Sequence, residues 1–95
     1  MEYSVVIFGH GENWEQDKPI WEQDLKPHQE YWRNYRLAED KIIGGGPFMD
    51  HSGGMVILEV EDLEEATKLV QKDPAVEMGL FSFKVHPWHL LSQKF

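Results

Sequence analysis

Two polar side chains, His28 and Asp73, are of the types that carry out proton transfer, and each lies at a predicted helix end. A carboxylate that accepts a hydrogen bond from one imidazole nitrogen orients the ring and fixes its tautomer. The other nitrogen is then left to act as a general base. The hypothesis of a catalytic pair therefore depends on whether the fold brings these two helix ends together.

The first expected helix carries His28 in its first turn. It runs from Asp24, which is of a type that can cap, to about Glu39, and Pro27 lies where its missing N–H costs nothing. Spacings of three and four place one set of residues on a single face. That set comprises Leu25, His28, Trp32, Tyr35 and Ala38 or Glu39.

The second expected helix ends at Asp73. It begins at Asp62 in a capping-box-like start, with Glu65 three residues later, and Pro74 pushes the residue before it out of the helical region. Its inward stripe comprises Leu63, Ala66, Leu69 and Val70. A carboxylate at a helix C-terminus meets partial negative charge, and a nearby imidazole would relieve that mismatch.

Four apolar runs predict strands, at residues 3–8, 41–43, 55–60 and 78–85, and the second continues into Gly44-Gly45-Gly46-Pro47. The order is β-α-β-β-α-β, which is the split βαβ or ferredoxin-like α+β fold. It has an antiparallel sheet with two helices on one face. In this topology the first helix starts and the second ends at the same edge, so His28 and Asp73 should converge at one rim.

The first and third strands lie in the middle of such a sheet, and both are apolar on both faces. Two helices cover only one face, and the other would be a larger apolar patch than soluble monomers normally expose. A second copy of the same sheet is the simplest cover. We therefore predict a homodimer packed through its sheet faces.

Aromatic residues around the expected rim suit a small planar or apolar ligand. Trp32 and Tyr35 lie on the helix stripe, while Trp14 and Trp21 lie in the long segment at residues 10–23. Purely structural interpretations remain open: His28 as a hydrogen-bonded residue at a helix start, Asp73-Pro74 as a helix stop, and the aromatic residues as core.

Composition excludes several classes of function. Nine Lys and Arg against seventeen Asp and Glu give a net charge of -8, which argues against binding nucleic acid or an anionic membrane. Cysteine is absent, and no apolar run approaches membrane-spanning length. The best metal-ligand spacing, His86-x-x-His89, is interrupted by Pro87, so we predict no metal site and no cofactor. One cytoplasmic domain over residues 1–95 is the expectation.

Short motifs along nearly the whole chain resemble the YciI-like (YCII-related) family. They are Trp21-Glu22-Gln23, Pro27-His28-Gln29-Glu30-Tyr31-Trp32, Ile42-Ile43-Gly44-Gly45-Gly46-Pro47-Phe48, Asp73-Pro74-Ala75-Val76, Gly79-Leu80 and Val85-His86-Pro87-Trp88. The resemblance implies a dimeric α+β barrel and enzymatic activity through a histidine and an aspartate, which match His28 and Asp73. It also implies that Gly46, Pro47 and Trp88 shape the cleft.

The function we expect is acid/base proton transfer of the isomerase or lyase type on a small, cyclic or aromatic molecule, without a cofactor. His28 would be the base or acid and Asp73 its orienting partner. Two alternatives remain: a dimeric module that binds a small ligand without chemistry, and a cofactor-free monooxygenase.

Overall fold

The computed structural model describes residues 2–93, without the side chains of residues 20 and 35–39. The elements follow in the order β1 (Glu2–His10), η1 (Ile20–Glu22, a 3-10 helix), α1 (Lys26–Glu39), β2 (Ile42–Pro47), β3 (Gly54–Val60), α2 (Leu63–Gln71), α3 (Pro74–Glu77) and β4 (Phe81–Trp88). The two short helices, η1 and α3, are additions to the pattern predicted from the sequence.

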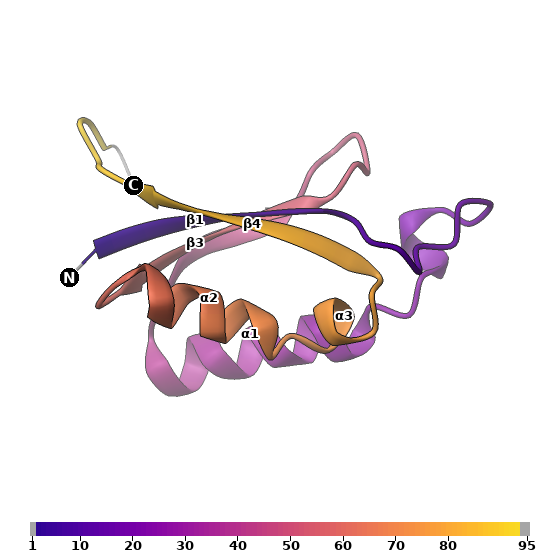
Figure 1. The fold of residues 1–95 in the computed structure, drawn as a ribbon, viewed down its shortest axis with the longest axis horizontal. Helices are drawn as coiled ribbons and strands as arrows, with labels where there is room; N and C mark the ends of the chain where they lie inside the picture. Colours follow the sequence, from indigo (N-terminus) through magenta and orange to yellow (C-terminus); the bar gives the residue numbers. More distant parts are fainter. Residues whose placement is uncertain (1, 94–95) are drawn as a thin grey trace.

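The strands form a four-stranded antiparallel sheet in the order β2-β3-β1-β4. The two strands that are apolar on both faces, β1 and β3, are therefore central, as predicted. Figure 1 shows α1, α2 and α3 on one side of this sheet. The ferredoxin-like α+β fold is thus confirmed. Within residues 2–93, no helix is both long and apolar enough to cross a bilayer.

The core lies between the sheet and the helices. Alternation along β1 turns Ser4, Val6 and Phe8 towards the helices, where their exposed fractions are 0%, 0% and 2%. Val6 lies opposite Val56 of β3 and Val85 of β4, so apolar side chains from three strands meet at one level of the core.

The starts of the two long helices differ in how well the sequence predicts them. Asp62 caps α2 by accepting a hydrogen bond from the Glu65 amide at 2.8 Å, as expected. Leu63, the first residue of α2, is exposed rather than part of the inward stripe. The expectation that Asp24 caps α1 is wrong, because Leu25 occupies the cap position and no side chain caps this helix. Leu25 is buried there.

The region after α2 also differs from expectation. The Asp73-Pro74 pair ends α2, but Asp73 then becomes the cap of α3 instead of the last residue of α2. Its backbone is extended, as the following proline requires, and its side chain accepts a hydrogen bond from the Ala75 amide. The carboxylate therefore caps the N-terminus of α3 through the Ala75 amide, and the predicted mismatch with a helix C-terminus does not arise.

The last strand begins later and ends later than predicted. Met78 is the C-terminal cap of α3, and Gly79 follows with a φ of 76°, a conformation that glycine adopts without strain. β4 starts at Phe81 and continues through Pro87 to Trp88. Because β4 is an edge strand, the missing N–H of Pro87 breaks no ladder hydrogen bond.

The face of the sheet opposite the helices is uncovered. It carries Val5 and Ile7 from β1 and Met55 and Ile57 from β3, all of them half-buried. The β2–β3 turn and the segment after β4 project to this side of the sheet (Figure 1). Apolar side chains thus occupy the centre of the uncovered face.

Candidate active site

The first turns of α1 bring two residues of the predicted site to the core. His28 and Trp32 are four residues apart and therefore share one face of the helix. Trp32 is buried, and the His28 side chain is 18% exposed. The histidine therefore lies at the boundary between the packed interior and an open surface.

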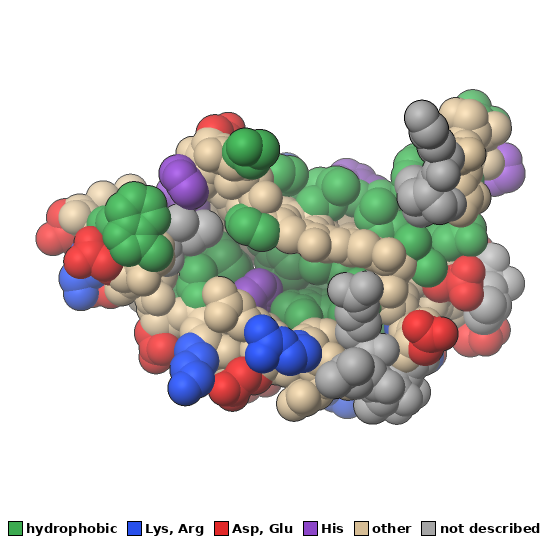
Figure 2. All heavy atoms as spheres, turned by 180° about the vertical axis from the view of Figure 1, so that it is seen from behind, with side chains coloured by type: hydrophobic (Ala, Val, Ile, Leu, Met, Phe, Trp, Pro, Cys, Tyr) green, Lys and Arg blue, Asp and Glu red, His purple; other side chains and the backbone are tan. Residues whose placement is uncertain are grey.

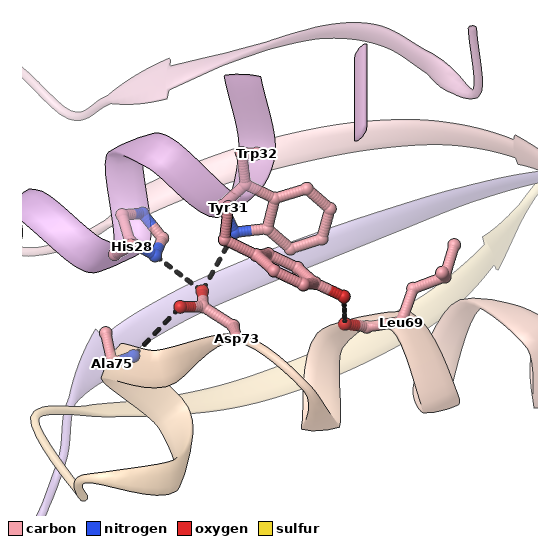
Figure 3. A network of polar contacts seen from close by, with 6 residues as sticks. All are labelled: His28, Tyr31, Trp32, Leu69, Asp73 and Ala75. Carbon is pink, nitrogen blue, oxygen red and sulfur yellow. Dashed lines mark hydrogen bonds and ion pairs between the residues drawn. The ribbon is translucent and has the colours of Figure 1, made fainter. Parts of the chain in front are cut away.

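The carboxylate of Asp73 is fully buried and has three N–H partners (Figure 3). Its Oδ2 contacts Nδ1 of His28 at 2.5 Å and accepts a hydrogen bond from Nε1–H of Trp32 at 2.8 Å. Its Oδ1 accepts one from the Ala75 amide at 2.9 Å. A buried carboxylate is costly without partners, and here both oxygens have them. Side chains of α1 and a backbone amide of α3 thus contact the same carboxylate, that of Asp73.

These contacts assign the tautomer of the imidazole. An ionised carboxylate can only accept hydrogen bonds, so Nδ1 of His28 carries the shared proton. In the neutral ring, Nε2 then keeps its lone pair. His28 also lines the open cleft described below.

Two phenylalanines hold the His28 ring from the sheet side. Phe8 of β1 and Phe81 of β4 meet it in edge-to-face contacts, with ring centres 5.4 and 5.1 Å away. On the helix side, Tyr31 donates a hydrogen bond to the Leu69 carbonyl at 2.5 Å and joins α1 to α2. The ring is thus held by one polar partner and two apolar ones, an arrangement that restricts its orientation.

The open surface beside His28 is a cleft of about 920 Å³. Figure 2 shows it as a hollow with hydrophobic side chains and a histidine at its floor and cationic side chains along its rim. It lies between the start of α1 and the β2–β3 hairpin. The residues that line it include Phe8, Trp21, Gln23, Asp24, Leu25, Lys26, His28, Gln29, Trp32, Arg33, Ile42, Gly45, Gly46, Pro47, Phe48, Met49, His51, Met55, Val56 and Phe81.

The seven residues predicted to bind substrate fall into three groups. Trp21, Trp32, Gly46 and Pro47 line the cleft beside His28. The side chain of Tyr35 lies outside the described residues.

Two of the residues predicted to bind substrate, Trp14 and Trp88, do not line the cleft beside His28. Trp14 is buried between the rings of His10 and Phe81, with centres 4.0 and 5.7 Å away. Trp88 is paired with Tyr3 at the far end of β1, because β4 continues through it.

Several lining residues were not predicted. Phe8 and Phe81 were recognisable as inward-facing strand residues, but their contact with His28 depends on the strand register. Phe48, Met49 and His51 come from the β2–β3 turn, which no periodic pattern places near α1. Among the described residues, no three His, Cys, Asp or Glu side chains gather closely enough to hold a metal ion.

Comparisons with known proteins agree on the type of domain. The family model described as YCII-related domain matches residues 6–89. A curated relative, the uncharacterized protein YjpA of Bacillus subtilis (strain 168), is 36% identical over 53 residues, which is 56% of this chain and 62% of YjpA. The match thus spans less than two thirds of that relative.

One solved structure has the same fold. It is the 5-chloro-2-hydroxyhydroquinone dehydrochlorinase TftG from Burkholderia phenoliruptrix AC1100, in complex with 2,5-dihydroxybenzoquinone. The TM-score is 0.63, over 90% of this chain and 93% of the other, with 22% sequence identity. At that identity the similarity establishes the shared fold.

Proposed function

The chain belongs to the family of YCII-related domains, and from that premise we propose that it is a small enzyme that moves a proton on a planar organic substrate. His28 is the base or acid, and Asp73 is its orienting partner. One observation carries the proposal: the 2.5 Å contact of Asp73 with Nδ1 of His28, beside a cleft that this histidine lines. Proton transfer needs only one positioned base, so the reaction requires no cofactor.

The chemistry follows from the tautomer. Nε2 of His28 takes a proton from a carbon or oxygen of the substrate, and the ring becomes an imidazolium next to the Asp73 carboxylate. In an isomerase the proton returns at another atom. In a lyase the electron pair of the broken C–H bond forms a double bond, and a leaving group departs with its own pair. The imidazolium then passes its proton to water.

The fold relative supports the lyase form. TftG is described as a dehydrochlorinase, and its structure holds a planar quinone. The walls of the cleft in this chain, with Phe8, Trp32 and Phe81 near His28, suit a ring of that kind. A cleft of about 920 Å³ also leaves room for a substrate larger than one ring.

We also propose that a second copy covers the open sheet face. Val5, Ile7, Met55 and Ile57 form an apolar centre there, while Lys84 and His86 lie nearer the edge on β4. An apolar centre with polar margins is the usual form of a protein interface. Sedimentation of the protein at micromolar concentration tests this, and a Val5→Asp substitution should shift the mass towards one chain.

The test of the catalytic role compares two histidines. 5-Chloro-2-hydroxyhydroquinone is supplied to the wild type, His28→Asn and His10→Asn, and chloride release and carbon-bound deuterium uptake from D2O are followed. We expect His28→Asn to lose turnover by roughly 10²- to 10⁴-fold. His10 is exposed and stacks on Trp14, so its replacement should leave turnover unchanged. Equal rates in all three proteins would contradict the role of His28.

A second function is favoured by the same network. Asp73 also bonds to Trp32 and caps α3, so the His28–Asp73 contact serves the packing as well. A module that binds a small ligand without chemistry would use the same cleft. If the protein only binds a ligand, 2,5-dihydroxybenzoquinone should quench its tryptophan fluorescence saturably, to the same extent in the wild type and in His28→Asn. No tested substrate should be turned over by either protein.

A further inference from the structure

The rim of the cleft is cationic in a strongly acidic chain. Lys26 and Arg33 line the cleft, and Asp24 is the one carboxylate among the described residues that does so. The whole chain has nine Lys and Arg against seventeen Asp and Glu. Two of the three Lys, Arg, Asp or Glu residues that line the cleft within the described part of the chain are thus cations, whereas the chain as a whole is negatively charged.

These two cations are not used in ion pairs within the described part of the chain. Lys18, Lys41 and Lys68 each have a carboxylate within 4 Å. No ion pair with a described residue involves Lys26 or Arg33. An exposed cation beside an apolar cleft can therefore meet a bound anion without first breaking a bond inside the protein.

The position of the cations on α1 connects them to the proposed base. Lys26, Gln29 and Arg33 follow one another at spacings of three and four and share one edge of the helix. His28 and Trp32 form the adjacent, more buried row. One helix thus presents a base with an aromatic wall on its inner row and donors for an anion on its outer row.

We propose that the cleft selects an organic anion, with a planar apolar body against Trp32, Phe8 and Phe81 and a carboxylate or phenolate group at Arg33. This inference rests on the proposed function, since it specifies the substrate class of the same site. A guanidinium presents donors in a fork that matches a carboxylate, and a neighbouring cation raises the local concentration of anions. Arg33 is the residue that determines specificity, and Lys26 adds charge.

The arrangement also assists the proton transfer. When Nε2 of His28 removes a proton, negative charge develops on the substrate and spreads through a conjugated ring to its oxygen atoms. A cation already in place at the rim stabilises that charge as it forms. The substrate group that Arg33 recognises can thus be the group that receives the charge.

The experiment measures binding of matched anionic and neutral probes by isothermal titration. Benzoate is compared with benzamide, and naphthalene-2-carboxylate with naphthalene-2-carboxamide. The proteins are the wild type, Arg33→Gln and Lys68→Gln. Lys68 is an exposed cation on α2 outside the cleft, so its replacement changes the net charge equally. Both variants replace exposed side chains, and urea unfolding confirms that each is folded.

We expect the wild type and Lys68→Gln to bind each carboxylate about two- to fivefold more tightly than its amide, the range for an exposed charged contact. Arg33→Gln should lose this preference, and added salt should weaken it in the wild type. Equal affinities, no carboxylate binding, a preference retained in Arg33→Gln, or full competition by inorganic phosphate would each overturn the proposal. Turnover that depends on His28 would survive any of these results, so the two proposals fail separately.

Discussion

Two buried polar groups lie near opposite ends of the inner face of β1, and they differ in their hydrogen bonding. One belongs to β1 itself, and the other reaches the strand through His28. Near its start, the Ser4 hydroxyl is fully buried and has no hydrogen-bond partner among the described residues. Near its end, Phe8 packs on His28, whose partner Asp73 is also fully buried but bonded through both oxygens. A hydroxyl can be left unpaired at modest cost, whereas a carboxylate cannot.

Between these two regions, the buried polar interactions are concentrated around Asp73 rather than around Ser4. Three separate N–H groups, from two helices, converge on Asp73, while the Ser4 end is a closed apolar core. The open cleft lies at the end with the organised carboxylate. Changes to the two groups should therefore have opposite effects on stability.

The largest effect is expected for Asp73→Asn. The three partners of Asp73 are all N–H groups, so either orientation of the amide sets an NH2 against a donor. We expect urea unfolding to show a loss of about 1–3 kcal/mol. Asp50→Asn is the matched control, because Asp50 is exposed and only its Oδ1 accepts hydrogen bonds, from Ser52. A similar loss in both variants would contradict the special position of Asp73.

Trp32→Phe removes one donor and keeps an aromatic wall. The Asp73 carboxylate then loses the bond from Nε1 and part of its cover. We expect a loss of about 1.5–2 kcal/mol in thermal or urea unfolding, at the lower end of the range for hydrogen bonds to charged groups. Trp21→Phe should change stability little, since Trp21 is 73% exposed. No difference between the two variants would mean that the indole bond contributes nothing.

Ser4→Ala tests the other end and should have the opposite sign. Removing a buried hydroxyl without a partner relieves its desolvation, so we expect a gain of up to about 1 kcal/mol in free energy of unfolding. Ser82→Ala is the comparison, because Ser82 is exposed and its hydroxyl donates to the His10 carbonyl. Destabilisation by Ser4→Ala would show that the hydroxyl has a partner, such as a buried water.

The smallest effect concerns Glu65, a carboxylate outside the core. The hydrogen bond from Lys41 and then the Glu61 amide hold the pKa of Glu65 below its ordinary value. Its stabilising contribution is therefore present above that ordinary value and is lost as the pH falls through the lowered pKa. Glu65→Gln should lose only a few tenths of a kcal/mol at neutral pH. Unfolding curves of the two proteins should converge in acid.

The sequence predicted the four strands from local periodicity, and the β-α-β-β-α-β order then placed the first and third strands at the centre of the sheet. The alternation of Phe81 and Phe83 with Ser82 and Lys84, for example, places β4 on the core in the expected sense. Asp62 was recognised as a cap because its partner Glu65 is only three residues away. Local signals of this kind need no knowledge of distant contacts.

What could not be predicted depends on distant contacts. The sequence suggested that His28 and Asp73 converge, but it contained no sign that Trp32 shares the carboxylate or that Asp73 starts a new helix. The outer wall from the β2–β3 turn was missed for the same reason. That Trp14 is covered by His10 and Phe81, and that Trp88 continues an edge strand away from the cleft, also depends on such contacts.

The prolines on the two outer strands have a consequence for assembly. Pro47 lies in β2 and Pro87 in β4, and β2 also has an irregular register between Ile42 and Gly44. Each outer strand therefore lacks an amide that an incoming strand would need, so neither edge is a good template for fibres. Growth by adding strands side by side is therefore disfavoured, and the sheet-to-sheet dimer proposed above would not depend on either edge.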